Sequence, residues 1–394
     1  MHIKHFLDDF RVEERIHFPG EQGAYDYYQV EKRDADLTTV REAMAEKLGV
    51  RPSAVTFPAP RDISAVTVQY ASVRKHGPIR FQGQGFVARC VQQGPRALKL
   101  KDLKGNRFNI MVRHLSKSES QNFGQILSQT LALGGLPNYF DDQRFASLTQ
   151  RGFIGKAILM QDAEEAVRMY LSESMRGDSE EMLAFKTLVK THWGQWGYLL
   201  HQAPRPSNLR SVVTYLKDHP HDYDKAVNLI QDQLLNFFLL AYQSWIWNRI
   251  LAQYLQRNAE ELLFVEIAGT KFPLPKSENV LEKLQTLVIE LPRLTTQYPG
   301  ELSDIAKNVL EEEGVTQADF NVRLLRRVCL TKCSRLTWFA PIDVEVGAPV
   351  IDENSPDHWA IPVSFSLPLG HYATLVLKAV AAHLGTTIKE IPEK

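Results

Sequence analysis

Asp62 is the first residue whose surroundings suggest chemistry. Residues 57–69 read FPAPRDISAVTVQ, so this carboxylate follows two prolines that exclude a helix and precedes a β-branched run that favours a strand. A carboxylate on a stiff turn can be aimed at a substrate carbon as a nucleophile. The neighbouring Arg61 would favour the ionised carboxylate or bind a substrate phosphate. The same local sequence also fits an aspartate that only ends a turn or caps a backbone amide. Without further context, such a structural role is the more frequent one.

The charges of the chain are balanced in number but uneven in position. Lys plus Arg and Asp plus Glu number 46 each, so the net charge by itself predicts no polyanionic partner. Residues 61–117, however, contain twelve Lys or Arg and only two acids, Asp62 and Asp102. Such a segment can present a positive face to a polyanion, although similar cations also occur on the solvated face of an ordinary sheet.

Several classes of protein lack support in the sequence. Three cysteines in 394 residues cannot staple a disulfide scaffold, and Cys329 with Cys333 lacks the second thiol pair of a zinc site. No phosphate-loop string occurs, and no second acid is placed at the separation from Asp62 that a glycosidase needs. The N-terminus lacks a signal-like apolar run, and residues 233–248 are too short to span a bilayer. We therefore expect a cytoplasmic protein with no metal site and no membrane segment.

Hydropathy patterns predict strands near the N-terminus of the chain. Residues 10–16, 65–73 and 107–115 favour strands, and the last of these carries apolar side chains on one face and Arg107 and Arg113 on the other. Residues 39–42 have the pattern of a capping box, so we expect a short helix that begins there and ends at the following glycine, residue 49.

The pattern becomes helical after about residue 152 and returns to strands near the C-terminus. Residues 226–255 are apolar on almost every side, which predicts a buried helix. Strands are expected at 338–346 and 361–367, followed by a helix at 372–384. This order predicts an α+β fold in which both chain ends form one domain, residues 1–153 and 336–394, and residues 154–335 form an inserted domain.

Six short motifs occur in one order along the chain. They are Lys4 with residues 9–14 (DFRVEE), residues 59–69 (APRDISAVTVQ), 104–108 (KGNRF), 137–146 (PNYFDDQRFA), 244–248 (SWIWN) and 367–374 (LPLGHYAT). In this set and order the chain resembles the TruD family of tRNA pseudouridine synthases. The resemblance implies a pseudouridine-synthase-like mixed, mostly antiparallel sheet flanked by helices, with a largely helical inserted domain that forms a cleft.

The resemblance assigns the catalytic role to Asp62. Its carboxylate would attack the target uridine at the sugar C1′ or at the base, or would assist formation of a glycal. The glycosidic C–N bond would then break, the base would rotate, and C5 would bond to C1′. The implied substrate is a D-arm uridine of tRNA, at position 13, and no cofactor is needed.

The resemblance also implies further site residues. Asn138 matches an asparagine that holds the aspartate, although a turn asparagine after a proline is plausible on its own. Phe140 matches an aromatic residue that stacks on the flipped uracil, although without the family a core phenylalanine is the more plausible interpretation. Arg144 is compatible with a phosphate contact or with an ion pair to Asp141 or Asp142. The remaining residues that we expect to bind substrate are Lys4, Phe10, Glu14 and Arg61. The cations that we expect on the RNA backbone are Arg74, Lys75, Lys104, Arg107 and Arg113.

Several positions depart from the family pattern, including Leu7 for a proline and Tyr25 for a histidine, and four of the departures lie in the motifs of the proposed site. Ala59 stands where the family has glycine, Arg61 where it has lysine, and Asp141 and Ala146 replace the glycines that flank the Gln-Arg-Phe core. Arginine keeps the charge of lysine but differs in reach and planarity. These departures leave a second hypothesis open, a TruD-like RNA-binding protein whose catalysis is weakened or lost. Under both hypotheses we expect tRNA as the partner and a monomeric protein.

Overall fold

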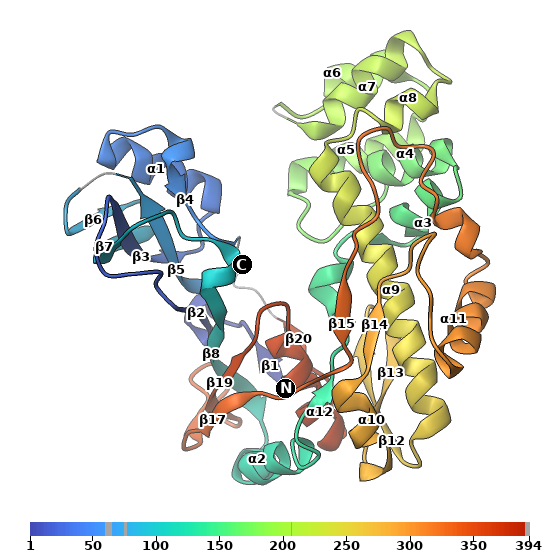
Figure 1. Ribbon diagram of the computed structural model, residues 1–394. Coiled ribbons are helices and arrows are strands. Elements are labelled where there is room, and N and C mark those ends of the chain that lie inside the picture. The colour runs from blue at the N-terminus through green and yellow to red at the C-terminus, as the bar shows by residue number, and fades with distance from the viewer. Residues whose placement is uncertain (60–64, 75–76, 206, 391–394) are drawn as a thin grey trace. The chain divides into compact units, whose positions relative to one another are not determined.

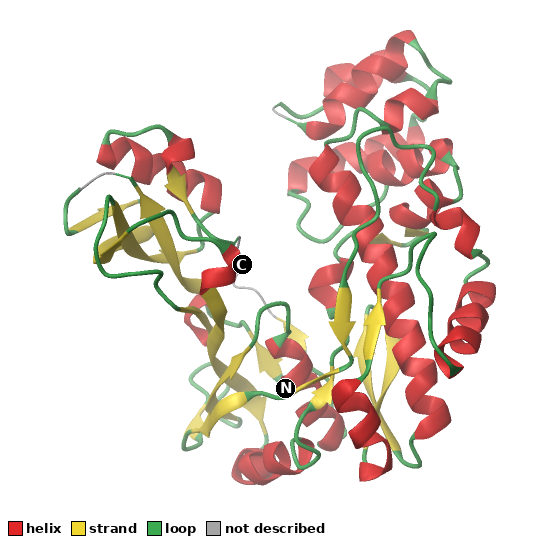
Figure 2. Ribbon diagram, in the orientation of Figure 1, coloured by secondary structure: helices red, strands yellow, loops and turns green. Residues whose placement is uncertain are grey.

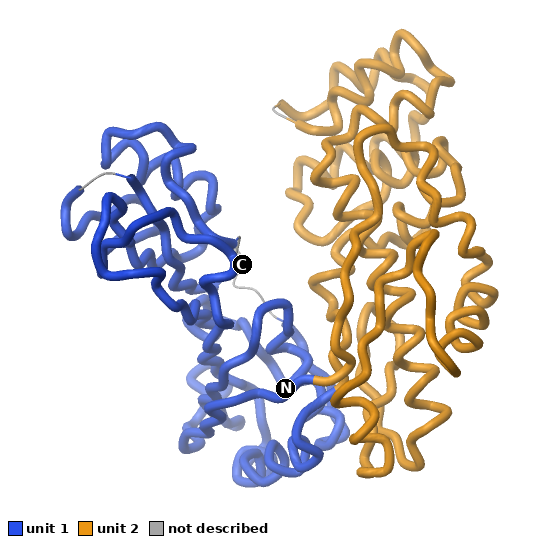
Figure 3. The backbone as a smooth tube through the Cα atoms, viewed as in Figure 1, with its two compact units in different colours: residues 1–136, 339–394 blue, residues 137–338 orange. Residues whose placement is uncertain are grey.

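Figure 1 shows a computed structural model of the protein, which describes residues 1–59, 65–74, 77–205 and 207–390. The chain forms two compact units (Figure 3). Unit 1 contains Met1–Leu136 and Phe339–Lys394, and unit 2 contains Pro137–Trp338. The domain limits drawn from the sequence differ from these, since residues 137–153 and 336–338 fall in unit 2. The fold is α+β, and Figure 2 shows the largest sheet in unit 1 and most of the helices in unit 2.

Unit 1 is built on one mixed sheet whose main path of described strands is β17-β19-β8-β2-β5-β3-β7-β6. Neighbouring strands are antiparallel except for the pairs β2 with β5 and β1 with β20, so the expectation of a mostly antiparallel mixed sheet is confirmed. The strands are β1 His2–Ile3, β2 Phe10–Ile16, β3 Tyr25–Arg33, β4 Val55–Thr56, β5 Val66–Val73, β6 Arg80–Gly83, β7 Phe86–Gly94, β8 Leu103–Leu115, β17 Ile342–Val346, β18 Val350–Ile351, β19 Trp359–Leu367 and β20 Lys389–Glu390.

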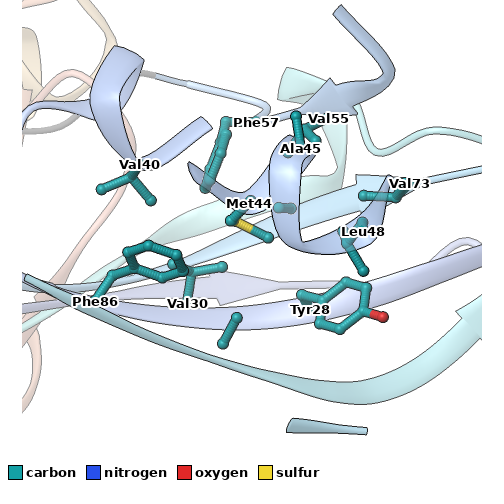
Figure 4. Close-up of a cluster of buried hydrophobic side chains, with 12 residues drawn as sticks. Tyr28, Val30, Val40, Met44, Ala45, Leu48, Val55, Phe57, Val73 and Phe86 are labelled. Atoms are coloured by element: carbon teal, nitrogen blue, oxygen red, sulfur yellow. The ribbon is translucent and has the colours of Figure 1, made fainter. Parts of the chain in front are cut away.

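Helix α1 (Leu37–Leu48) covers part of this sheet. Val40, Met44 and Leu48 lie on its buried face and pack with the sheet residues Tyr28 and Val30 (Figure 4). Helices α2 (Lys117–Thr130) and α12 (Ala373–His383) contact each other, and α2 also contacts β8 and β19. The apolar face of α2 therefore covers sheet surface that would otherwise face water, and α12 packs against α2.

The start of α1 corrects an expectation. The helix begins at Leu37 rather than Thr39, because the Asp36 carboxylate accepts hydrogen bonds from the backbone N–H groups of Thr38 and Thr39 at 2.8 and 3.2 Å. Aspartate is a strong N-cap, so it displaces the start that the capping-box pattern predicted. The predicted end is confirmed, since Gly49 adopts φ 61° in the left-handed region.

Unit 2 is organised around α9 (Asp232–Asn258), a 27-residue helix buried along most of its length. Helices α3 and α11 and strand β13 contact it. Gly155 of α3 lies so close that a Cβ there would be 2.2 Å from the carbonyl O of Phe238. The other helices of unit 2 are α3 Ile154–Leu159, α4 Ala163–Ser172, α5 Glu180–Thr191, α6 Trp196–Gln202, α7 Asn208–Asp218, α8 Tyr223–Val227, α10 Leu281–Thr286 and α11 Glu301–Glu312.

The buried helix predicted for residues 226–255 is confirmed, although the pattern did not predict the break between α8 and α9.

Short strand pairs complete unit 2. The strand pairs are β12 Leu262–Ile267 with β13 Thr270–Pro275, β14 Val288–Glu290 with β15 Ser334–Leu336, and β10 Leu148–Thr149 with β11 Gly152–Phe153. Along the chain, unit 2 begins within β9 (Leu136–Pro137) and ends within β16 (Trp338–Phe339). In the described part of the chain, no helix combines the length and apolar character needed to cross a membrane.

Candidate active site

The segment that carries Asp62 joins β4 to β5, and Asp62, Arg61 and Lys75 lie outside the described residues. Described residues on either side of it are hydrogen-bonded to each other. Gln69 of β5 is 1 % exposed, and its side-chain Nε2 donates to the carbonyl O of Ala59 at 3.0 Å. This hydrogen bond fixes the main chain three positions before Asp62. The sequence analysis named Gln69 only as part of the motif at residues 59–69. Its hydrogen bond to Ala59 gives a physical reason for a side-chain amide at this position.

Three predicted substrate-binding residues lie near the N-terminus of unit 1, Lys4 after β1 and Phe10 and Glu14 on β2. Lys4 has φ 56°, and its Nζ lies 4.6 Å from the centroid of the Phe10 ring and 3.4 Å from Oε1 of Glu390. Glu14 is buried on β2, and its Oε2 accepts a hydrogen bond from the backbone N–H of Tyr70 at 2.9 Å. Glu14 therefore ties β2 to β5, the strand that follows the Asp62 segment.

The predicted phosphate-binding cations of unit 1 differ in exposure. Arg74 and Lys104 are exposed. Arg107 is half-buried, with its Nη2 3.1 Å from the Glu345 carboxylate and donating to Ser364 Oγ at 2.9 Å. A phosphate would reach Arg74 and Lys104 directly, whereas it would have to compete with a carboxylate for Arg107.

Arg113 corrects the expectation of an exposed cationic strand face. Its guanidinium is buried and lies 2.8, 3.1 and 3.0 Å from carboxylate oxygens of Asp9, Asp352 and Glu353. Burial by itself would lower the pKa of Arg113, but hydrogen bonds and charges, led by those of Asp9, raise it overall. The sequence could not show these partners, because they lie 104 to 240 positions away along the chain. Arg113 holds the fold of unit 1 and is not retained among the phosphate contacts.

In unit 2, Asn138 is held at both ends of its side chain. It is 2 % exposed, its Nδ2 donates to the carbonyl O of Leu336 at 2.8 Å, and its Oδ1 accepts from Arg335 Nη2 at 2.5 Å. Arg335 Nε also donates to the backbone O of Asn138 at 2.9 Å. Asn138 is therefore fixed by β15, a strand that the sequence analysis did not connect with it.

Phe140 lies against cationic and aromatic groups. The Arg335 guanidinium carbon is 4.3 Å from the ring centroid, and that of Arg144 is 5.6 Å away. The Trp247 ring meets Phe140 edge-on, at 84° and 5.5 Å between centroids. At these distances cation–π attraction is favourable, so Arg335 binds both residues that the sequence analysis proposed here, Asn138 and Phe140.

The backbone of Phe140 is fixed by Asn248 from α9. Asn248 is fully buried, accepts from the Phe140 N–H at 2.9 Å and donates to the Phe140 carbonyl O at 2.8 Å. One amide therefore satisfies a donor and an acceptor that would otherwise be buried without partners. Tyr139 points elsewhere, since its buried hydroxyl donates to Pro273 O at 2.9 Å and burial raises the pKa of this phenol.

Two of the departures from the family pattern cause no backbone strain. Asp141 has φ −105° and Ala146 has φ −58°, and any L-residue adopts these values without cost. Neither position requires a glycine in this chain. Among the described residues, no group of three or more His, Cys, Asp or Glu side chains is arranged to hold a metal ion.

The comparison with known proteins extends over nearly the whole chain. The family model described as tRNA pseudouridine synthase D (TruD) matches residues 1–380. A probable tRNA pseudouridine synthase D 2 of Methanocaldococcus jannaschii is 28 % identical over 97 % of this chain and 92 % of its own length. A tRNA pseudouridine synthase D of Aquifex aeolicus is 27 % identical over 91 % of this chain and 92 % of its own.

A solved structure is similar in fold as well. The crystal structure of the putative tRNA pseudouridine synthase D from Methanosarcina mazei superposes with a TM-score of 0.73 at 25 % identity, covering 96 % of this chain and 92 % of that one. The family match, the relatives and the fold agree with the resemblance that the six motifs indicated. The chain belongs to the TruD family of tRNA pseudouridine synthases, which are isomerases.

Proposed function

We propose that this protein converts a D-arm uridine of tRNA, at position 13, to pseudouridine, with Asp62 as the nucleophile. The observation that carries the proposal is the family match over residues 1–380, which includes the Asp62 segment and the segment of Asn138 and Phe140. The protein acts as a monomer in the cytoplasm under this proposal.

The reaction is an isomerisation and needs no other reactant. The ionised Asp62 carboxylate adds to C1′ or to the base, or assists loss of the base as a glycal. The N1–C1′ bond breaks, the uracil rotates, and C5 bonds to C1′. The bond from the Asp62 oxygen to C1′ or to the base then breaks, or in the glycal route C2′ regains the proton it lost, so that the free carboxylate is restored. C5 gives up its proton to solvent and N1 gains one, so that atoms and charge balance. The target nucleotide must leave its stack, which costs a few kcal/mol, and contacts between cations and phosphates offset this cost.

The surroundings of Phe140 bear on how a uracil could stack on its ring. Because Phe140 is 5 % exposed, a uracil can stack on its ring only if a neighbouring side chain moves. Arg144 is the group that yields under this proposal, because its guanidinium lies farther from the ring than that of Arg335, at 5.6 against 4.3 Å. Arg335 is held in addition by two hydrogen bonds to Asn138.

Tritium release tests the proposal. An unmodified tRNA transcript that carries [5-³H]uridine loses tritium to water when C5 becomes the glycosidic carbon. We expect release with the wild type, none with Asp62→Asn, and release at the wild-type rate with Asp357→Asn, which removes an exposed carboxylate of unit 1. A wild-type protein that binds the transcript but releases no tritium would instead support the RNA-binding hypothesis without catalysis.

A further inference from the structure

A strongly basic coil runs through unit 2 between α11 and β15. No acidic residue occurs between Asp319 and Asp343, whereas this interval contains Arg323, Arg326, Arg327, Lys332 and Arg335. We call residues 321–333 the basic strap; in Figure 1 it is part of the orange-red chain that enters β15. The sequence analysis placed its basic segment at residues 61–117 and did not single out this one.

The main chain of the basic strap is held by two side-chain amides. Asn228 donates from Nδ2 to Leu324 O at 2.9 Å and accepts from the Arg326 N–H at 3.1 Å. The buried Gln243 of α9 donates to Thr331 O at 3.1 Å and accepts from the Thr331 N–H at 3.2 Å. The coil therefore has one defined path although it forms no helix or strand.

The side chains of the basic strap divide into anchors and exposed cations. Leu325 and Val328 are 6 % and 7 % exposed and fasten the coil to unit 2. Arg323, Arg326 and Lys332 are exposed and form no ion pair with a described carboxylate. A fixed coil with unneutralised cations loses little conformational entropy when it binds a chain of phosphates.

The position of the basic strap indicates which polyanion it fits. The strap ends two residues before Arg335, the residue that holds Asn138 and Phe140. An RNA whose target base approaches Phe140 would bring neighbouring phosphates near this end of the strap. From the charge, the fixed path and this continuity, we propose that the basic strap binds the tRNA backbone through Arg323, Arg326 and Lys332. This inference rests on the proposed function.

Matched triple variants test the inference. The strap variant is Arg323→Gln, Arg326→Gln, Lys332→Gln, and the control is Lys217→Gln, Lys283→Gln, Lys307→Gln, which removes the same charge from exposed helical positions of unit 2. Binding of an unmodified tRNA transcript is measured over a series of KCl concentrations. We expect the strap variant to bind about tenfold more weakly or worse, and the slope of log K against log [KCl] to shrink by about 2 to 3. The control should stay within about twofold of the wild type.

The native cysteines allow a second test of tRNA binding, on the protein without substitutions. Cys329 and Cys333 are exposed on the basic strap, while Cys90 lies in unit 1. Excess tRNA should slow alkylation of Cys329 and Cys333 by iodoacetamide, as read by mass spectrometry, and Cys90 reports the reagent's activity in the same sample.

Two results would overturn the inference. One is equal loss of tRNA binding, or none, in the two triple variants, which would leave an acidic protein as the partner of the strap. The other is alkylation of Cys329 and Cys333 at an unchanged rate in the presence of tRNA. Both readouts measure binding, so they are independent of tritium release, and the strap and the proposed function can fail separately.

Discussion

Arg335 contacts both residues to which the sequence analysis gave a role in unit 2. Its planar guanidinium makes two hydrogen bonds to Asn138 and lies over the Phe140 ring. Lysine cannot reproduce this geometry, because an ammonium has no rigid fork and no flat face. Arg335 therefore acts as a positioning residue, through Asn138 and Phe140.

We expect Arg335→Lys to lower kcat for tritium release by about 10- to 100-fold, because small displacements of site groups carry losses of this size. The Kd for tRNA should change less than about threefold, because the charge is kept. Arg257→Lys, at an exposed position of α9, is the control and should leave kcat within about twofold of the wild type. A change confined to Kd would contradict the positioning role.

Asn248 is expected to matter for stability. Asn248→Ala leaves the buried N–H and C=O of Phe140 without partners, so the free energy of unfolding should fall by about 2–4 kcal/mol. Asn236→Ala changes an exposed asparagine of the same helix and should stay within about 0.5 kcal/mol. Urea unfolding of both variants measures the difference, and equal midpoints would show that Asn248 carries no such role.

At the scale of elements, hydropathy period and turn residues predicted several strands of unit 1, together with α1 and α12, but not all their limits, and they did not predict β3, β7 or α2. The strand at residues 65–73, the long buried helix and the end of α1 at Gly49 followed from local pattern. The ion pairs of Arg113 and the contacts of Arg335 did not, because their partners come from distant parts of the chain. Local sequence encodes periodicity and caps, whereas the partner of a charged side chain depends on the fold.

The contact between α3 and α9 depends on a glycine. In Gly155→Ala the new Cβ would lie 2.2 Å from a backbone oxygen of α9, so we expect a loss of about 1–3 kcal/mol in the free energy of unfolding. Gly124→Ala in α2 has no heavy atom within 4 Å of its new Cβ and should stabilise by about 0.5–1 kcal/mol. Thermal unfolding of the two variants distinguishes the effect of packing from that of helix propensity. A Tm shift of the same sign in both variants would contradict the close contact between α3 and α9.

Three stacked imidazoles of unit 1 predict that the stability of the fold depends on pH. The His114 ring lies 4.3 Å from His2 and 3.7 Å from His358, centroid to centroid. Burial, followed by the charge of His114, lowers the pKa of His2 to about 4, and burial and His358 lower the pKa of His114. Because the folded state disfavours the protonated forms, the stack stabilises fully above the unfolded pKa of about 6.5 and loses this contribution as pH falls toward 4.

Between pH 7.5 and 5 we therefore expect the Tm to fall. His114→Asn should flatten the dependence, because it removes the central ring while asparagine tolerates the φ of 57° at this position. Differential scanning fluorimetry at a series of pH values measures both. An unchanged slope in the variant would show that the stack does not cause the dependence.

At the scale of the whole molecule, the order of strand, helix and strand patterns predicted that both chain ends form one unit and the middle another. The limits of the two units differ from the predicted domain limits because residues 137–153 have little helix or strand pattern of their own. Their position depends on contacts with α9 and β15, such as those of Asn138 and Phe140. The basic strap escaped prediction for a related reason. Its charge was visible, but the exposure of its cations and the amides that fix its path follow only from the fold.

Position-resolved mapping of one tRNA transcript tests the central claim most directly. After incubation with the wild type, mass spectrometry of nuclease fragments should find pseudouridine at the D-arm uridine of position 13, and a transcript with cytidine there should gain none. The same transcript treated with Asp62→Asn should keep its uridine although it binds. Pseudouridine formed by Asp62→Asn at the wild-type rate, or formed only outside the D arm, would contradict the account.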